Sequence, residues 1–309
     1  MTFYKYVPPQ RVDILEKNCI LFSPPALFND PFEMRPLFDA VEDPSNAAAK
    51  WAVGKNSIPF LLNHIHNRYD ELSPDERAAT NFDDFMKNFV SSSHTTDPSS
   101  ISEIVRLEVK ASVRALNADP LTANNMLREA LNEAVGVLSL TKTKDNLLMW
   151  AHYAQSHTGF VIELDETNDF FHQQRSATDQ FGYAREVVYS ETRPTNLLLV
   201  NAPFETIYLV KSERDWKYEQ EWRVLRSLED ANGSVKIDIT DEDSGTIRSY
   251  PTFHLPPECI TGIIMGCRMS ETCKRKIGNI LKGTREYSHT KLQAASIAET
   301  RFSINIEDI

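Results

Sequence analysis

The order of strand-like and helix-like segments constrains the fold of this chain more than any other feature of its sequence. Short apolar segments typical of strands occur at 3–7 and 19–22, and they return after residue 135. Between them, residues 43–135 show helical spacing, most clearly over 101–116. We therefore expect an α+β fold in which a mostly antiparallel β core carries a helical insertion at 43–135.

The same patterns predict the individual elements. A helical turn or two is expected over 10–18, and further helices are expected over 47–53, 58–69, 83–90, 101–116, 123–135, 146–154 and 273–281. The later strands are expected over 136–141, 159–164, 184–189, 221–225, 234–239, 248–254, 260–265, 291–297 and 302–306. With 309 residues, we expect one large domain that contains the insertion.

Charge and composition exclude several classes of protein. The 44 acidic and 33 basic residues give a net charge of −11, so a broad nucleic-acid-binding face is not expected, although a local basic pocket remains compatible. No apolar run approaches a membrane span, and the first residues lack the apolar core of a secretory signal. These features predict a cytoplasmic protein that does not enter a membrane.

Cysteine and histidine spacing predicts free thiols and no metal centre. Cys19, Cys259, Cys267 and Cys273 form no CxxC pair, which favours unpaired thiols in a reducing compartment. The histidines lack the neighbouring cysteines or carboxylates of a zinc site. Phosphate-binding glycine loops, serine-nucleophile elbows and HExxH motifs do not occur either. The chemistry that remains would depend on one or two carboxylates positioned by His, Tyr and Asn.

Two segments of the first half of the chain have both a structural and a functional interpretation. In 28–33, Asn29 or Asp30 either forms a turn that bonds nearby backbone amides, or Asn29 or Glu33 lies at the rim of a pocket. In Tyr4-Lys5-Tyr6, the side chains either belong to an edge strand, or Tyr6 or Lys5 lines one wall of a ligand pocket.

The segment 147–159 has two interpretations as well. Leu147, Trp150 and Ala154 share one face of the expected helix and predict a core stripe, whereas His152 and Tyr153 lie off this stripe. The structural interpretation makes His152 a hydrogen-bonding residue beside the core. In the functional interpretation, this polar and aromatic edge stacks on a heteroaromatic ring and hydrogen-bonds a ribose.

The segment 216–223 is the most informative. If 219–225 is extended, Glu219, Glu221 and Arg223 point to one face of the strand. The two carboxylates would repel each other unless Arg223 separates them or both serve a function. A surface ladder of ion pairs and a catalytic site are both compatible with this pattern.

Several longer motifs resemble the bacterial DUF2971 family, whose name assigns no function. The resemblance rests on the opening YKY, on FSPPALFNDPFE at 22–33, on the long segment at 138–165, and on KYEQEWRVLR at 217–226. VVYS at 187–190 and ITGIIMGCRM at 260–269 extend it. These motifs bracket almost the whole chain, and 43–135 is the part that departs most from the family.

The order of several residues also resembles that of ADP-ribosyltransferases. That family places a basic or aromatic residue on the first strand, a Ser- or Tyr-bearing strand and helix in the middle, and a catalytic Glu, often in an E-x-E pair, near a late strand. The corresponding positions here are Tyr6 or Lys5, then Ser139 with His152 and Tyr153, and finally Glu219-x-Glu221. The Ser-Thr-Ser triplet of the family is absent, and the insertion is long.

This second resemblance implies a split β core of ADP-ribosyltransferase type, a single catalytic-type domain over 1–309, and NAD as the substrate, without a metal. Glu221 would stabilise the oxocarbenium-like ribose and Glu219 would assist the acceptor nucleophile. Tyr153 would stack on nicotinamide, and Arg223 or Lys211 would meet the pyrophosphate. The residues that would bind NAD are Lys5, Tyr6, Asn29, Ser139, His152, Tyr153 and Arg223.

The acceptor of such a reaction stays open between RNA, DNA and protein. A toxin or an anti-phage defence effector, with an antitoxin or chaperone as partner, is the biological setting that the resemblance implies. Two alternatives remain. In a non-enzymatic ligand-sensing or protein-interaction module, Glu219 and Glu221 would merely pair with Arg223. A nuclease would need metal-binding carboxylates beside the pocket.

Overall fold

The computed structural model describes residues 2–34, 37–40, 72–79, 129, 132–174, 181–193, 195–197, 208–239 and 246–309. The chain divides into two compact units, of which the first comprises 1–36, 127–194 and 204–309 and the second 37–126 and 195–203. In the second unit, β3 (Leu37–Ala40) pairs in parallel with β8 (Thr195–Leu197), and α4 spans Pro74–Ala79.

The helices expected over 47–53, 58–69, 83–90 and 101–116 lie outside the described residues, as does most of the one expected over 123–135. The single catalytic-type domain and the bounds 43–135 of the insertion therefore stay predictions. None of the helices in the described ranges combines the length and the apolar character that a membrane span needs.

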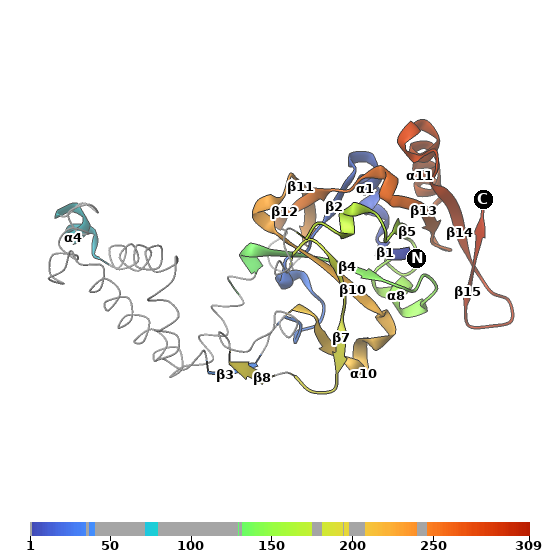
Figure 1. Ribbon diagram of the computed structural model, residues 1–309. Coiled ribbons are helices and arrows are strands. Elements are labelled where there is room, and N and C mark those ends of the chain that lie inside the picture. The colour runs from blue at the N-terminus through green and yellow to red at the C-terminus, as the bar shows by residue number, and fades with distance from the viewer. Residues whose placement is uncertain are drawn as a thin grey trace. The chain divides into compact units, whose positions relative to one another are not determined.

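The first unit is built on an eight-stranded sheet with the strand order β15-β14-β13-β5-β1-β4-β10-β6 (Figure 1). Neighbouring strands are antiparallel except for β13 and β14, which are parallel. The α+β class with a mostly antiparallel core is thus confirmed, while its ADP-ribosyltransferase type stays a prediction. The strands are β1 (Thr2–Val7), β4 (Val135–Thr141), β5 (Phe160–Asp165), β6 (Ala184–Glu186), β10 (Glu221–Ser227), β13 (Ile260–Met265), β14 (Lys291–Ile297) and β15 (Ile304–Asp308).

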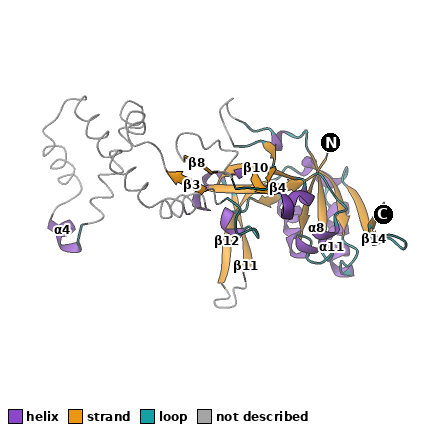
Figure 2. Ribbon diagram, turned by 90° about the horizontal axis from the view of Figure 1, so that it is seen from below, coloured by secondary structure: helices purple, strands orange, loops and turns teal. Residues whose placement is uncertain are grey.

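A second, three-stranded sheet has the order β11-β12-β2, and Figure 2 shows β11 and β12 projecting away from the eight-stranded sheet. Its strands are β2 (Cys19–Leu21), β11 (Gly233–Ile239) and β12 (Thr246–His254), and β7 (Val188–Ser190) forms a separate parallel pair with β9 (Val210–Ser212). The helices of this unit are α1 (Asp13–Lys17), α8 (Leu147–His152), α10 (Glu213–Trp216) and α11 (Glu271–Gly283).

The prediction of one strand over 184–189 is wrong. The chain changes partner at Val187, whose amide donates to the Glu221 carbonyl, while the next amide, of Val188, donates to the Leu209 carbonyl. As a result, β6 pairs with β10 and β7 pairs with β9. This change of partner brings the segment around Tyr189 to the beginning of β10.

The eight-stranded sheet separates two apolar clusters, as alternating side chains on buried strands require. Phe160 and Ile162 of β5 belong to the larger cluster, which also contains Ile277 of α11. Val161, between them, belongs to the smaller cluster together with Trp150 of α8. The two helices therefore pack against opposite faces of the sheet, through alternating side chains of β5.

The sheet opens between β1 and β4. β1 pairs with β5 at six positions and β4 pairs with β10 at seven, but β1 and β4 share only the pair of Tyr4 with Thr141. Beyond that pair the two strands separate, so the following residues of β1 and the preceding residues of β4 face a gap. This gap places the cavity described below.

Gly159 closes the turn between α8 and β5, and a side chain is not tolerated there. A Cβ atom at this position would overlap the Val7 carbonyl oxygen of the neighbouring strand. We expect Gly159→Ala to lower the free energy of unfolding by about 2 kcal/mol or more, because backbone on both sides must move. Urea denaturation of the full chain measures this loss.

Gly278→Ala is the matched control. Gly278 lies within α11 and has open space where a Cβ would be. Alanine is the better helix former, so this variant should gain about 0.5–1 kcal/mol. Equal stability of the two variants would show that the β1–Gly159 contact does not constrain the fold.

Candidate functional site

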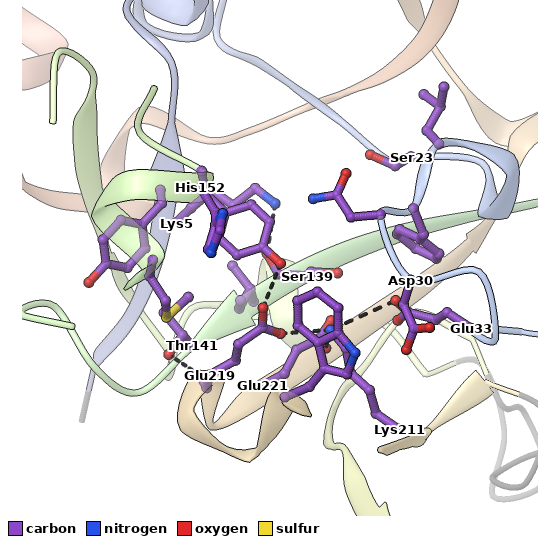
Figure 3. A pocket seen from close by; sticks show the side chains of 18 of the residues that line it. Lys5, Ser23, Asp30, Glu33, Ser139, Thr141, His152, Lys211, Glu219 and Glu221 are labelled. Atoms are coloured by element: carbon purple, nitrogen blue, oxygen red, sulfur yellow. Dashed lines mark hydrogen bonds and ion pairs between the residues drawn. The ribbon is translucent and has the colours of Figure 1, made fainter. Parts of the chain in front are cut away.

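The opening between β1 and β4 leads into a cavity of about 500 Å³. Lys5 and Tyr6 come to it from β1, Asn29 from the 28–33 loop and Ser139 from β4. His152 and Tyr153 come from α8 and its end, while Glu219 and Glu221 come from the beginning of β10. Eight of the nine residues predicted from the sequence thus line one cavity (Figure 3).

A buried cluster of ionised side chains forms the floor of this cavity. The Lys211 ammonium lies 2.6 Å from Oε2 of Glu219 and 3.0 Å from Oε2 of Glu221, so that it joins the two carboxylates. Arg223 is fully buried, and its Nε lies 2.8 Å from Oε1 of Glu221. Glu33 pairs with Arg223 and lies 3.7 Å from Lys211.

The cluster contains three carboxylates and two cations. Because all five side chains are buried, each carboxylate depends on a cation partner for its stability as an anion. Burial by itself lowers the pKa of Lys211, but the negative charges of Glu221 and Glu219 outweigh burial and raise that pKa. Lys211 therefore stays charged across the physiological pH range.

The two acidic residues also have neutral partners. The Tyr153 hydroxyl donates to Oε1 of Glu219 at 2.5 Å, and burial together with the Glu219 charge raises the pKa of this tyrosine. The Ser139 hydroxyl hydrogen-bonds Glu221, opposing the rise that burial causes in the pKa of that carboxyl. Both acids are thus held in fixed positions by hydrogen bonds and ion pairs.

The prediction that 219–225 is extended is wrong at its first two residues. Lys217–Glu219 is a short 3₁₀ helix, Gln220 has a left-handed φ of 45°, and β10 begins at Glu221. Glu219 and Glu221 nevertheless reach the same cavity, because the left-handed residue turns the chain between them. Gln220 itself is exposed.

Arg223 requires a correction, since the sequence suggested that it binds the pyrophosphate of NAD. The structure places it behind the cavity wall, where Nη1 donates to the Tyr208 carbonyl and the other nitrogens bind Glu221 and Glu33. All three nitrogens of its guanidinium therefore bind groups of the protein itself. Lys211, the alternative suggested for the same role, is likewise occupied by Glu219 and Glu221.

Sequence reasoning missed Tyr189 and Trp216. The pairing of β7 with β9 aligns Tyr189 with Lys211, and the Tyr189 hydroxyl accepts a hydrogen bond from the Glu221 amide at 2.8 Å. The Trp216 ring lies 4.6 Å from the Lys211 ammonium. The available signal was Lys211, which directly follows the apolar run 207–210. A charge at the end of such a run needs buried neighbours, and Tyr189 and Trp216 are among them.

The mouth of the cavity is more exposed than its floor. His152 and Asn29 are exposed, whereas Tyr6 is buried and donates its hydroxyl to the Thr143 carbonyl at 3.2 Å. The turn predicted around Asn29 depends on Asp30, whose Oδ1 accepts from the Phe32 amide at 2.8 Å. Within the described ranges, no group of three or more His, Cys, Asp or Glu side chains could hold a metal ion.

These features define an α+β protein whose mostly antiparallel sheet opens onto an acidic cavity with aromatic walls. Residues 149–224 match the model of the family described as "Protein of unknown function (DUF2971)". The match includes Tyr153, Lys211, Glu219, Glu221 and Arg223. Neither a curated protein nor a solved structure was found to match the chain.

Proposed function

We propose that the chain is an NAD-dependent ADP-ribosyltransferase-like enzyme. The observation that carries this proposal is the adjacency of β1, β4 and β10, which brings Tyr6, Ser139 and the two acidic residues to one cavity. Along the sequence, these residues follow the order of the corresponding ADP-ribosyltransferase positions, with Tyr6 first, Ser139 in the middle and the acidic pair late. The cavity volume of about 500 Å³ is within the range of small-molecule sites.

Glu221 acts on the nicotinamide ribose. Cleavage of the bond between nicotinamide and ribose develops positive charge at the anomeric carbon, and a fixed carboxylate stabilises that charge. Arg223, Lys211 and Ser139 hold the Glu221 carboxylate in place before the substrate arrives. Because the protein dipoles are already oriented, little reorganisation is needed during the reaction.

The remaining residues of the cavity would orient NAD and its acceptor. Tyr153 offers an aromatic face for nicotinamide, and its hydroxyl holds Glu219, which would assist the acceptor nucleophile as a hydrogen-bond acceptor. Asn29, His152 and Tyr6 complete the walls. As part of the proposal, the acceptor is a nucleic acid or a protein, as expected of a toxin or anti-phage defence effector.

The proposal is tested by incubating the full chain with NAD labelled in the adenosine moiety, with and without a bacterial lysate. We expect nicotinamide release in both samples and transfer of the label to macromolecules in the lysate. Digestion of the labelled products with RNase, DNase or protease then identifies the class of acceptor. Intact NAD after prolonged incubation would contradict the proposal.

One observation favours a non-enzymatic ligand-binding module instead. Glu221 pairs with Arg223 and Glu219 pairs with Lys211, so the ion cluster has a structural role whether or not the chain is an enzyme. Under this alternative, NAD or another nucleotide would raise the thermal unfolding temperature of the protein without being consumed. Thermal shift and nicotinamide release, measured on the same sample, separate the two functions.

A further inference from the structure

Lys5 occupies the opening of the sheet. Its side chain lines the cavity, and its ammonium donates to the Ser139 carbonyl at 2.8 Å, across the gap between β1 and β4. This carbonyl is the one hydrogen-bond partner of the Lys5 amine among the described residues, and no carboxylate of those residues pairs with it within ion-pair distance.

The amine of Lys5 therefore differs from the other basic groups of the site. Lys211 pairs with three carboxylates and Arg223 with two, and both stay protonated. Lys5, by contrast, is half-buried in the cavity wall and has one neutral acceptor. In the neutral form, its amine can keep the hydrogen bond to Ser139 and direct its lone pair into the cavity.

The two acidic residues of the proposed reaction, Glu219 and Glu221, already accept hydrogen bonds that protonation would disturb. Both oxygens of Glu219 already accept hydrogen bonds, one from Tyr153 and the other from Lys211. Both oxygens of Glu221 likewise accept from Arg223, and one also accepts from Lys211. A nucleophile that loses a proton in this cavity thus meets carboxylates that hydrogen-bond donors already stabilise as anions.

Burial brings the pKa of the Lys5 ammonium closer to neutral pH. Burial lowers the pKa of the ammonium to about 8; the Glu221 and Glu219 carboxylates oppose this change and Arg11 adds to it. The other titratable groups that face the same cavity are Tyr4, Tyr6, Asp30, Glu33, His152, Tyr153 and Lys211. Groups that titrate near the working pH are the most effective general bases.

We propose that Lys5 is the general base that takes the proton of the attacking nucleophile. The inference rests on the proposed function and deepens it. With water as the nucleophile, the bond between nicotinamide and ribose breaks, the water oxygen bonds to the anomeric carbon, and neutral nicotinamide leaves with the electron pair of the broken bond. The water proton passes to the Lys5 amine, which later releases it to solvent. A hydroxyl or amino group of an acceptor would react in the same way.

The first experiment measures the pH dependence of nicotinamide release from NAD by the full chain. Because the neutral amine is the active form, kcat should rise about tenfold per pH unit below pH 8 and level off above it. Lys5→Arg keeps the charge and the donor to Ser139 but stays protonated, so kcat should fall roughly 10²-fold or more and the rise through pH 8 should disappear. KM for NAD should change little.

Two further variants separate a base from a structural residue. In Lys5→Ala, added methylamine should restore part of the activity, because a small amine can occupy the vacated space and accept the proton. His152→Gln removes the other nitrogen base of the cavity and should leave the rise through pH 8 in place. If the rise disappears in His152→Gln and persists in Lys5→Arg, His152 is the base and the proposal for Lys5 is overturned.

A third measurement does not depend on activity. The rate at which acetic anhydride acetylates Lys5, measured by mass spectrometry from pH 6 to 11, reports the titration of its amine. It should be half-maximal near pH 8, and acetylation of the more exposed Lys144 is followed in the same sample for comparison. Titration of Lys5 above pH 10 would overturn the base role. Absence of nicotinamide release from the unaltered protein would overturn the proposed function, and the base role with it.

Discussion

Replacing Arg223 by methionine is expected to lower the free energy of unfolding by about 3–5 kcal/mol. Arg223 is fully buried and binds Glu33 and Glu221, so its loss leaves three buried carboxylates with Lys211 as the nearest cation. Such uncompensated charge in the protein interior is among the most destabilising changes known. The midpoint of urea denaturation, compared with that of the unaltered chain, measures the effect.

A double variant distinguishes charge from packing. In Arg223→Met combined with Glu33→Gln, one of the unpaired carboxylates becomes neutral, and part of the lost stability should return. Arg226→Met provides a matched control, because Arg226 lies three residues further along β10 and stacks against Phe170 and Phe22 without binding the cluster. A loss below about 1 kcal/mol in Arg223→Met would contradict the structural account of the ion cluster.

Replacing Glu221 by glutamine is expected to reduce nicotinamide release from NAD by about 10²–10³-fold or more, because the fixed negative charge beside the ribose is removed. The fold should survive, since Arg223 keeps Glu33 and Lys211 keeps Glu219 as partners. Initial rates at saturating NAD, measured together with the urea midpoint, separate catalysis from stability.

Glu213→Gln is the matched control for this substitution. Glu213 pairs with Lys217 on the surface, and neither residue lines the cavity. The control should retain full activity. Activity close to that of the unaltered chain in Glu221→Gln would remove Glu221 from the reaction, and the role of the cluster would then be structural.

Much of the fold was predictable because its strands are short apolar segments with clear ends. Residues 19–22, 136–141 and 260–265 predicted β2, β4 and β13 to within a residue or two, and Gly283 marked the end of α11. The register between β1 and β4 was not predictable, because its single pair, Tyr4 with Thr141, joins segments that are far apart in the sequence. The opening of the sheet between β1 and β4 could therefore not be predicted from the sequence.

The residues of the candidate site were predictable, but the ion pairs and hydrogen bonds between them were not. The alternation of charged and aromatic residues in 216–223 pointed to Glu219 and Glu221, and both reach the cavity. The role of Arg223 depends on Glu33, which lies 190 positions earlier in the chain. Local pattern can place a side chain on a face of a strand, but it does not reveal the distant partner that neutralises its charge.

The central claim is that NAD binds in the opening between β1 and β4 with its nicotinamide ribose beside Glu221. A crystal structure of the full chain soaked with a non-hydrolysable NAD analogue tests this claim most directly. The account predicts that the ribose hydroxyls lie within hydrogen-bond distance of Glu221 and that the nicotinamide ring lies against Tyr153. Density for the analogue elsewhere on the protein, with this cavity unchanged, would contradict it.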